Sequence, residues 1–196
     1  MRQVLCIAVL FFAFAAISAT GQCPYSFATP FAPTGPGISQ QVVAFAGGTA
    51  PGLYVERINL NGGATAILRY AGGPYVEVPK PPGFGSAALT SFNDGSGTAL
   101  IAAFTALAVF PPTSTVMRWN GNAWTAYGTA LPQVYRLVVL DDGSGPALYA
   151  AGLVGPGSPS GVARWNGTTW VSIGNGGFGT ALGVFDLEMF NDGSGV

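Results

Sequence analysis

Short apolar runs recur along the chain, and turn-forming residues separate them. In the clearest stretch the runs are residues 135–140, 147–153, 161–165 and 170–174, all rich in Val, Leu, Tyr and Trp. Gly, Pro, Asn, Asp or Ser stand between the runs, and Asp-Gly and Asn-Gly pairs favour tight hairpin turns. Outside the N-terminal apolar stretch, no segment shows the 3.6-residue period of a helix. The pattern predicts an all-β protein.

These runs repeat with a period of about 48 residues. Three near-identical pentapeptides place Asp94, Asp142 and Asp192 at spacings of 48 and 50. Each copy also carries an arginine followed by two aromatic residues, and these are Arg69, Tyr70 and Tyr75, then Arg118, Trp119 and Trp124, then Arg164, Trp165 and Trp170. Four antiparallel strands that recur every 40–50 residues are typical of a β-propeller blade.

The repeats set the expected domain boundaries. Blades are predicted at about 39–80, 86–130 and 133–176, and the start of a fourth, incomplete blade at 180–196. Residues 20–38 form a Pro/Gly-rich lead-in segment. Because closed propellers contain about 4–8 blades, we expect 39–196 to form a partial propeller. Its unpaired blade faces would favour self-association.

The order of strand, Gly-rich turn, aromatic residue, short turn and Trp resembles kelch-type propeller blades, including those of galactose-oxidase-like domains. It is more similar still to uncharacterised secreted bacterial proteins with repeated Asp-Gly-Ser-Gly and Trp-Asn-Gly turns. The resemblance covers about residues 39–196 and implies a propeller fold. It departs from the kelch pattern after the second strand, where Ala150-Ala151-Gly152 replaces the diglycine. The resemblance does not extend to the copper and radical site of galactose oxidases, because such a site needs His and this chain has none.

The N-terminus carries the pattern of a secretory signal peptide. Arg2 precedes a charge-free run at 4–17, and Ser18, Ala19 and Thr20 are small. The run is short for a membrane span, which needs about 20 residues. We therefore expect residues 1–19 to be removed and the protein to be secreted, on the cell surface or in the periplasm. Cys23 would then be the one remaining cysteine, so no internal disulfide forms.

Charge composition narrows the function classes. Only 8% of the 196 residues are charged, and the formal net charge is −1. With seven basic residues in total there is no patch to neutralise phosphates, so nucleic-acid binding is not expected. The absence of His removes His-based triads, general bases and metal ligands. We expect no catalytic residue, no cofactor and no metal site.

Three sets of recurring residues are candidates for function, and each also has a structural interpretation. The aspartates are predicted to cap hairpin turns rather than bind calcium, which wants about six to eight oxygen ligands. The arginines are predicted to tie strand ends or neighbouring blades, the alternative being a ring that binds an anionic ligand. The aromatic residues are predicted to fill the space between blades rather than stack on sugars. Asp186 and Glu188 share a strand face, but little else supports a hydrolytic carboxylate pair there.

The sequence favours a secreted, non-catalytic propeller that serves as a binding or structural scaffold for a protein or glycan ligand. Two alternatives remain open. The chain is the propeller part of a larger extracellular enzyme, or it is a carbohydrate-binding lectin.

Overall fold

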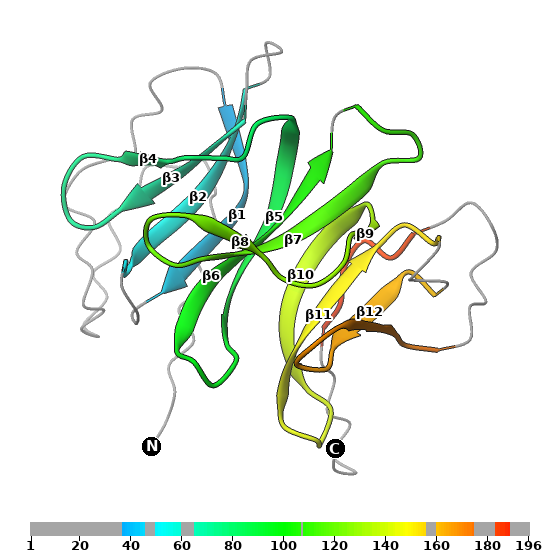
Figure 1. Cartoon of the computed structure of the whole chain (residues 1–196). Coiled ribbons are helices and arrows are strands. Elements are labelled where there is room, and N and C mark those ends of the chain that lie inside the picture. Colours follow the sequence, from blue (N-terminus) through cyan, green and yellow to red (C-terminus); the bar gives the residue numbers. More distant parts are fainter. Residues whose placement is uncertain are drawn as a thin grey trace, which may run out of the picture. The chain divides into compact units, whose positions relative to one another are not determined.

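The protein is all-β and antiparallel in the computed structural model (Figure 1). The structure describes residues 37–45, 50–59, 65–106, 108–155, 160–174 and 183–188. Those residues contain no helix, and so none that is long and apolar enough to cross a membrane. The predicted signal peptide, Cys23, Asp192 and most of the predicted lead-in segment and fourth blade lie outside the described residues.

The strands of the described residues form two four-stranded sheets and one five-stranded sheet, and in each sheet four strands are neighbours in chain order. The first sheet contains β1 (Gly37–Phe45), β2 (Gly52–Asn59), β3 (Ala66–Tyr70) and β4 (Val76–Val78). The second contains β5 (Phe84–Asn93), β6 (Thr98–Ala106), β7 (Thr113–Trp119) and β8 (Trp124–Ala126), with β9 (Leu131–Pro132) paired to β7. The third contains β10 (Val134–Asp141), β11 (Pro146–Gly152), β12 (Val162–Trp165) and β13 (Trp170–Ser172).

Strand pairing follows the sequence repeat residue by residue. Between the first and second strands, Val42 pairs with Val55, Leu89 with Ala102 and Leu137 with Ala150. Between the third and fourth strands, the two tryptophans of each pair are opposite one another, Trp119 with Trp124 and Trp165 with Trp170. The same register recurs because a slip of one residue would exchange the two faces of a sheet.

The second sheet is covered on both faces, as β6 shows most clearly. Its residues Leu100, Ala102 and Phe104 pack in one apolar cluster with Tyr54 and Ile67 of the first sheet. The alternate residues of β6 pack in a second cluster with the third sheet, and these are Ala99, Ile101 and Ala103. Successive side chains of a strand point to opposite faces, so a strand buried on both faces reads as the continuous apolar run seen here. Figure 1 shows the second sheet between the other two.

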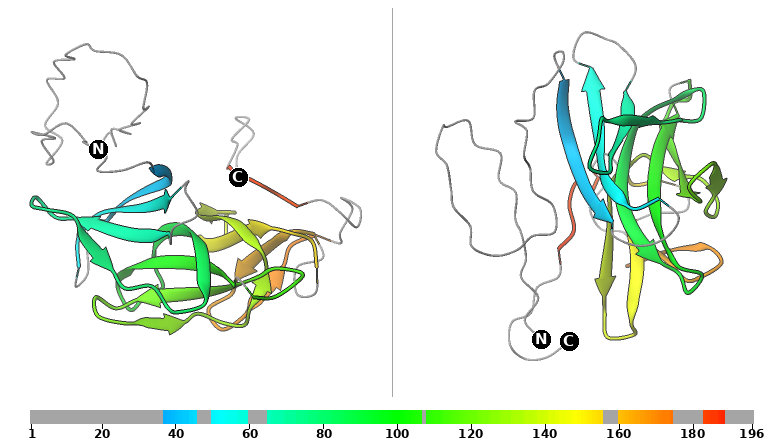
Figure 2. Two further views of the ribbon diagram at one scale, coloured as in Figure 1. Left: turned by 90° about the horizontal axis from the view of Figure 1, so that it is seen from above. Right: turned by 90° about the vertical axis from the view of Figure 1, so that its left-hand side faces the viewer.

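Residues 183–188 follow the third sheet and lie against it. Leu153 forms an isolated bridge with Gly183, and the Val184 amide donates to the Gly152 carbonyl at 2.9 Å. This segment is coloured red in Figure 2. When Asp192 is aligned with Asp142, this segment corresponds to the start of β10. It therefore takes the position of the first strand of a fourth repeat.

Candidate functional site

The hairpin turn between the first two strands of the second sheet is built by two side chains. Asn93 Oδ1 accepts hydrogen bonds from the amides of Gly95 and Gly97 at 3.0 and 3.2 Å. Asp94 Oδ1 accepts from the Ser96 amide at 3.0 Å and from the Ser96 hydroxyl at 2.6 Å. Short polar side chains stabilise turns in this way by replacing backbone partners. Both aspartate and asparagine therefore act first on their own turn.

The third sheet repeats this turn with the same atoms. Asp141 Oδ1 accepts from the amides of Gly143 and Gly145 at 3.0 and 2.9 Å. Asp142 Oδ1 accepts from the amide and the hydroxyl of Ser144. Asp141 stands where the second sheet has Asn93, so the amide and the carboxylate serve equally as the acceptor at this position.

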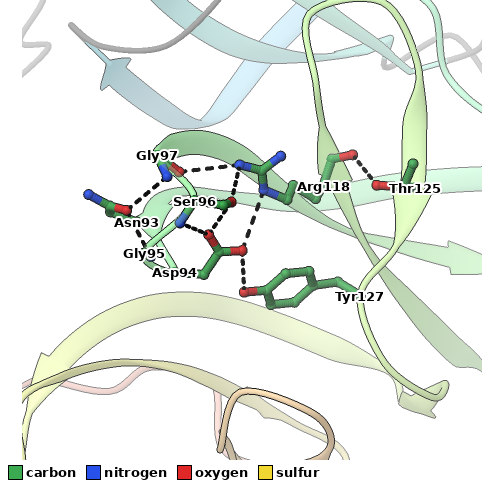
Figure 3. A network of polar contacts seen from close by, with 8 residues as sticks. All are labelled: Asn93, Asp94, Gly95, Ser96, Gly97, Arg118, Thr125 and Tyr127. Atoms are coloured by element: carbon green, nitrogen blue, oxygen red, sulfur yellow. Dashed lines mark hydrogen bonds and ion pairs between the residues drawn. The ribbon is translucent and has the colours of Figure 1, made fainter.

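An arginine from the third strand closes each turn, and Figure 3 shows this for Arg118 in the second sheet. Arg118 Nη2 donates to Ser96 Oγ at 3.1 Å and to the Gly97 carbonyl at 3.2 Å, and its Nε lies 3.6 Å from Asp94 Oδ2. Arg164 Nη2 donates to Ser144 Oγ at 2.6 Å, and its Nε lies 3.4 Å from Asp142 Oδ2. The arginines therefore contact the carboxylate and hydroxyl groups of the hairpin turn in their own sheet.

A tyrosine completes each network, but from different places in the two sheets. Tyr127, which follows β8, donates to Asp94 Oδ2 at 3.1 Å. Tyr149, on β11, donates to Asp142 Oδ2 at 2.7 Å. The position equivalent to Tyr149 in the second sheet is Ile101, and the position equivalent to Tyr127 in the third sheet is Ile173. Each network thus has one tyrosine hydroxyl. The sequence repeat did not indicate that this tyrosine comes from different repeat positions in the two sheets.

These contacts stabilise the charged form of both aspartates. Burial raises the pKa of Asp94, but hydrogen bonds from Ser96 and Tyr127 and the charge of Arg118 outweigh it, so the pKa is lowered overall. Hydrogen bonds from Ser144 and Tyr149 hold the pKa of Asp142 well below its ordinary value. Burial and the neighbouring Asp94 carboxylate raise the pKa of Tyr127. The tyrosines therefore remain neutral donors to ionised carboxylates at neutral pH.

The first sheet keeps the arginine but not the aspartate. Gly47 stands at the position of Asp94 and Asp142. Arg69 donates through Nε and Nη2 to the Pro51 carbonyl at 3.1 and 2.7 Å. The Tyr54 hydroxyl donates to the Ala50 carbonyl at 2.6 Å. The arginine therefore binds backbone where no carboxylate is present.

The four tryptophans lie at the contacts between sheets, whereas Tyr70 and Tyr75 of the first sheet pack against each other. Trp119, Trp165 and Trp170 are buried, Trp124 and Tyr70 are half-buried, and Tyr75 is 41% exposed. The indole Nε1 of Trp124 donates to the Pro79 carbonyl at 2.7 Å, and that of Trp170 to the Tyr127 carbonyl at 2.9 Å. Each acceptor directly follows the fourth strand of the preceding sheet. The indoles therefore link the second sheet to the first and the third to the second.

Of the two carboxylates considered as a hydrolytic pair, Asp186 forms an ion pair with the third sheet. Asp186 Oδ1 lies 3.1 Å from Arg136 Nε, an ion pair without the geometry of a hydrogen bond. The neighbouring Phe185 ring stacks on Tyr135 with centroids 4.8 Å apart. Asp186 thus contacts a cation on β10, and the contact helps to hold residues 183–188 against the third sheet.

A shallow, open depression of about 440 Å³ lies where the hairpin ends of the second and third sheets meet. Its floor is largely apolar, and its polar groups include the hydroxyls of Ser91 and Thr98. Its other lining residues are Phe92, Asn93, Gly95, Val139 and Pro146. Within the described ranges, His, Cys, Asp and Glu side chains do not gather in any group of three that could hold a metal ion.

Profiles of known protein families, characterised proteins and solved structures were each compared with this chain, and none of the comparisons found a match.

Proposed function

We propose that this chain forms a partial β-propeller that is secreted and non-catalytic and acts as a binding or structural scaffold. The observation that carries the proposal is the repeated link from a fourth-strand indole to the carbonyl that follows the preceding fourth strand. A contact rule that recurs from sheet to sheet is what a radial array of blades requires. The signal-peptide pattern of residues 1–19 supports the secreted location.

The recurring charged side chains favour a scaffold over an enzyme. Arg118 and Arg164 bind the turn of their own sheet, and Asp94 and Asp142 accept hydrogen bonds from the same turn. Stabilisation of the hairpin turn in each sheet is thus sufficient to explain why these side chains recur at a regular spacing. The open depression between the hairpin ends, with hydroxyls beside apolar side chains, suits a peptide or glycan held at the surface.

Two assays with one variant pair test the proposal. Wild type and the double variant Arg118→Gln/Arg164→Gln are screened on chromogenic glycosides, esters and phosphates, and on an array that includes sialylated and sulfated glycans. We expect no turnover by either protein and a lower melting temperature for the variant. Turnover would contradict the non-catalytic scaffold. Binding of anionic glycans that the variant loses at unchanged stability would contradict a purely structural role of the arginines and support an arginine-lined site.

A further inference from the structure

The third sheet ends in a turn that resembles the one that receives aromatic side chains in the second sheet. Ile173 and Gly174 follow β13 just as Tyr127 and Gly128 follow β8, and both glycines have positive φ, 80° and 87°. We call Ile173–Gly174 the acceptor turn. Its glycine has nearly the same φ as the glycine of a turn that is already occupied in this protein.

The occupied turn is filled by the third sheet. The Trp165 ring lies 4.4 Å from the Tyr127 ring, centroid to centroid, and leaves Tyr127 only 8% exposed. A Cβ on Gly128 would lie 2.6 Å from Trp165 and 2.8 Å from Trp170, so only glycine fits. Ile173, by contrast, is 42% exposed, and of the described residues a Cβ on Gly174 would meet only Ser160, whose Cβ lies at 3.8 Å. The described residues around the acceptor turn therefore leave space for an aromatic pair.

The first sheet presents such a pair at the opposite end of the repeat. Tyr70 and Tyr75 lie at the positions of Trp165 and Trp170, with ring centroids 5.4 Å apart against 5.4 Å for the tryptophans. Tyr75 is 41% exposed. We propose that the acceptor turn of one chain binds the Tyr70–Tyr75 pair of a second copy, in a head-to-tail contact that continues the contact between the second and third sheets.

Residues 183–188, which we call the strap, regulate this contact. The strap occupies the place that β1 of a second copy would take beside β10, so it has to leave when the copies associate. Its described contacts are few: one backbone hydrogen bond, one bridge, the Arg136–Asp186 ion pair and the Tyr135–Phe185 stack. Phe185 remains 69% exposed. With so few contacts, the strap can be displaced by β1 of a second copy. Weakening the strap should therefore strengthen association.

Sedimentation velocity on the full chain across micromolar concentrations tests the proposal, which rests on the repeat scaffold proposed above. Wild type should associate in a concentration-dependent way. Ile173→Glu and Tyr75→Glu should each prevent it, whereas Val109→Glu, at an exposed valine between β6 and β7, should not. An equimolar mixture of the two blocked variants should form dimers, because each retains the surface that the other has lost.

Two gain-of-association variants complete the test. Tyr75→Trp supplies an indole donor and should lower the dissociation constant about fivefold, the effect of one net hydrogen bond. Phe185→Ala/Asp186→Ala should also tighten association by loosening the strap. Circular dichroism and melting verify each fold, and a glutamate variant that melts early is replaced by serine.

Three results would overturn the inference. They are a wild type that stays monomeric, a loss of association in only one of the two blocked variants, and a mixture that fails to recover dimers. The scaffold proposal is judged separately, by the turnover and glycan assays, and a monomeric chain would leave it standing.

Discussion

The indole of Trp170 donates a hydrogen bond to the carbonyl of Tyr127, and so ties the fourth strand of the third sheet to the chain segment that leaves the second. Trp124 makes the same link to Pro79 one sheet earlier. Because both donors occupy the same place in the repeat, the contact between sheets is encoded once per copy. The links also bury large aromatic surfaces, which is the main source of stability at such contacts.

The contributions of the hydrogen bond and of ring burial to stability can be measured separately at Trp170 and Trp165. Trp170→Phe keeps an aromatic ring but removes the donor, and should lower the free energy of unfolding by about 1 kcal/mol. Trp165→Ala removes a buried ring without touching that bond, and should cost about 3–5 kcal/mol. Urea denaturation gives both values. A loss under about 0.5 kcal/mol for Trp165→Ala would mean that the ring is exposed, and the lectin interpretation would gain support.

Two glycines with nearly the same backbone form a matched pair. Gly128→Ala and Gly174→Ala both place a Cβ at positive φ, which costs about 1–2 kcal/mol. Only Gly128→Ala also drives that Cβ into the rings of Trp165 and Trp170. We expect it to be the more destabilising by a further 1–3 kcal/mol, roughly the cost of overpacking. Equal losses of stability in a monomeric sample would contradict the packing described here.

Acid should weaken the turns that Asp94 and Asp142 cap. Their folded-state pKa values are lowered, so the stabilisation is complete above the unfolded value of about 3.9 and is lost as pH falls through the folded pKa. The urea midpoint should therefore fall below about pH 5 in wild type, and the decline should be smaller in Asp94→Asn/Asp142→Asn. Asp141→Asn is the control, since Asn93 fills the equivalent position. A double variant with the wild-type profile would contradict this account.

A double variant can test whether the repeat position of Tyr127 can supply the tyrosine hydroxyl that Tyr149 supplies in the third sheet. Tyr149→Phe removes the hydrogen bond that the phenol donates to Asp142 and the one that it accepts from Arg164 Nε, and should lower stability by about 1–2 kcal/mol. Ile173→Tyr, in the Tyr149→Phe background, supplies a phenol from the position that Tyr127 has in the second sheet. Part of the loss should return, measured by thermal or urea unfolding. If the second substitution recovers nothing, the two positions are not interchangeable.

The sequence predicted the elements well because each depends on local chemistry. Strand runs, the Asp-Gly and Asn-Gly turns and the 48-residue period follow from alternating burial and turn residues. All four strands of the clearest copy are present, with ends shifted by a few residues. The all-β, antiparallel prediction is confirmed, whereas the arrangement of the sheets as blades of a partial propeller stays a proposal.

What the sequence could not predict depends on distances between residues far apart in the chain. The short strand β9 pairs with the start of β7, and a two-residue strand has too little pattern to recognise. Which tyrosine reaches an aspartate depends on how the segment after β8 or β13 returns to its own sheet. The Arg136–Asp186 contact likewise needs the fold, because it joins residues from successive copies.

Proton–proton nuclear Overhauser contacts measure the central claim, the repeated link between sheets, most directly. In a monomeric sample, the account predicts contacts from the Trp170 ring to the Gly128 α-protons and from the Trp124 indole N–H to protons of Pro79. It also predicts slow hydrogen exchange for the Trp124 and Trp170 indole N–H groups. Both indoles exchanging at the rate of free tryptophan, with neither contact present, would contradict the link and with it the repeated packing of sheet on sheet.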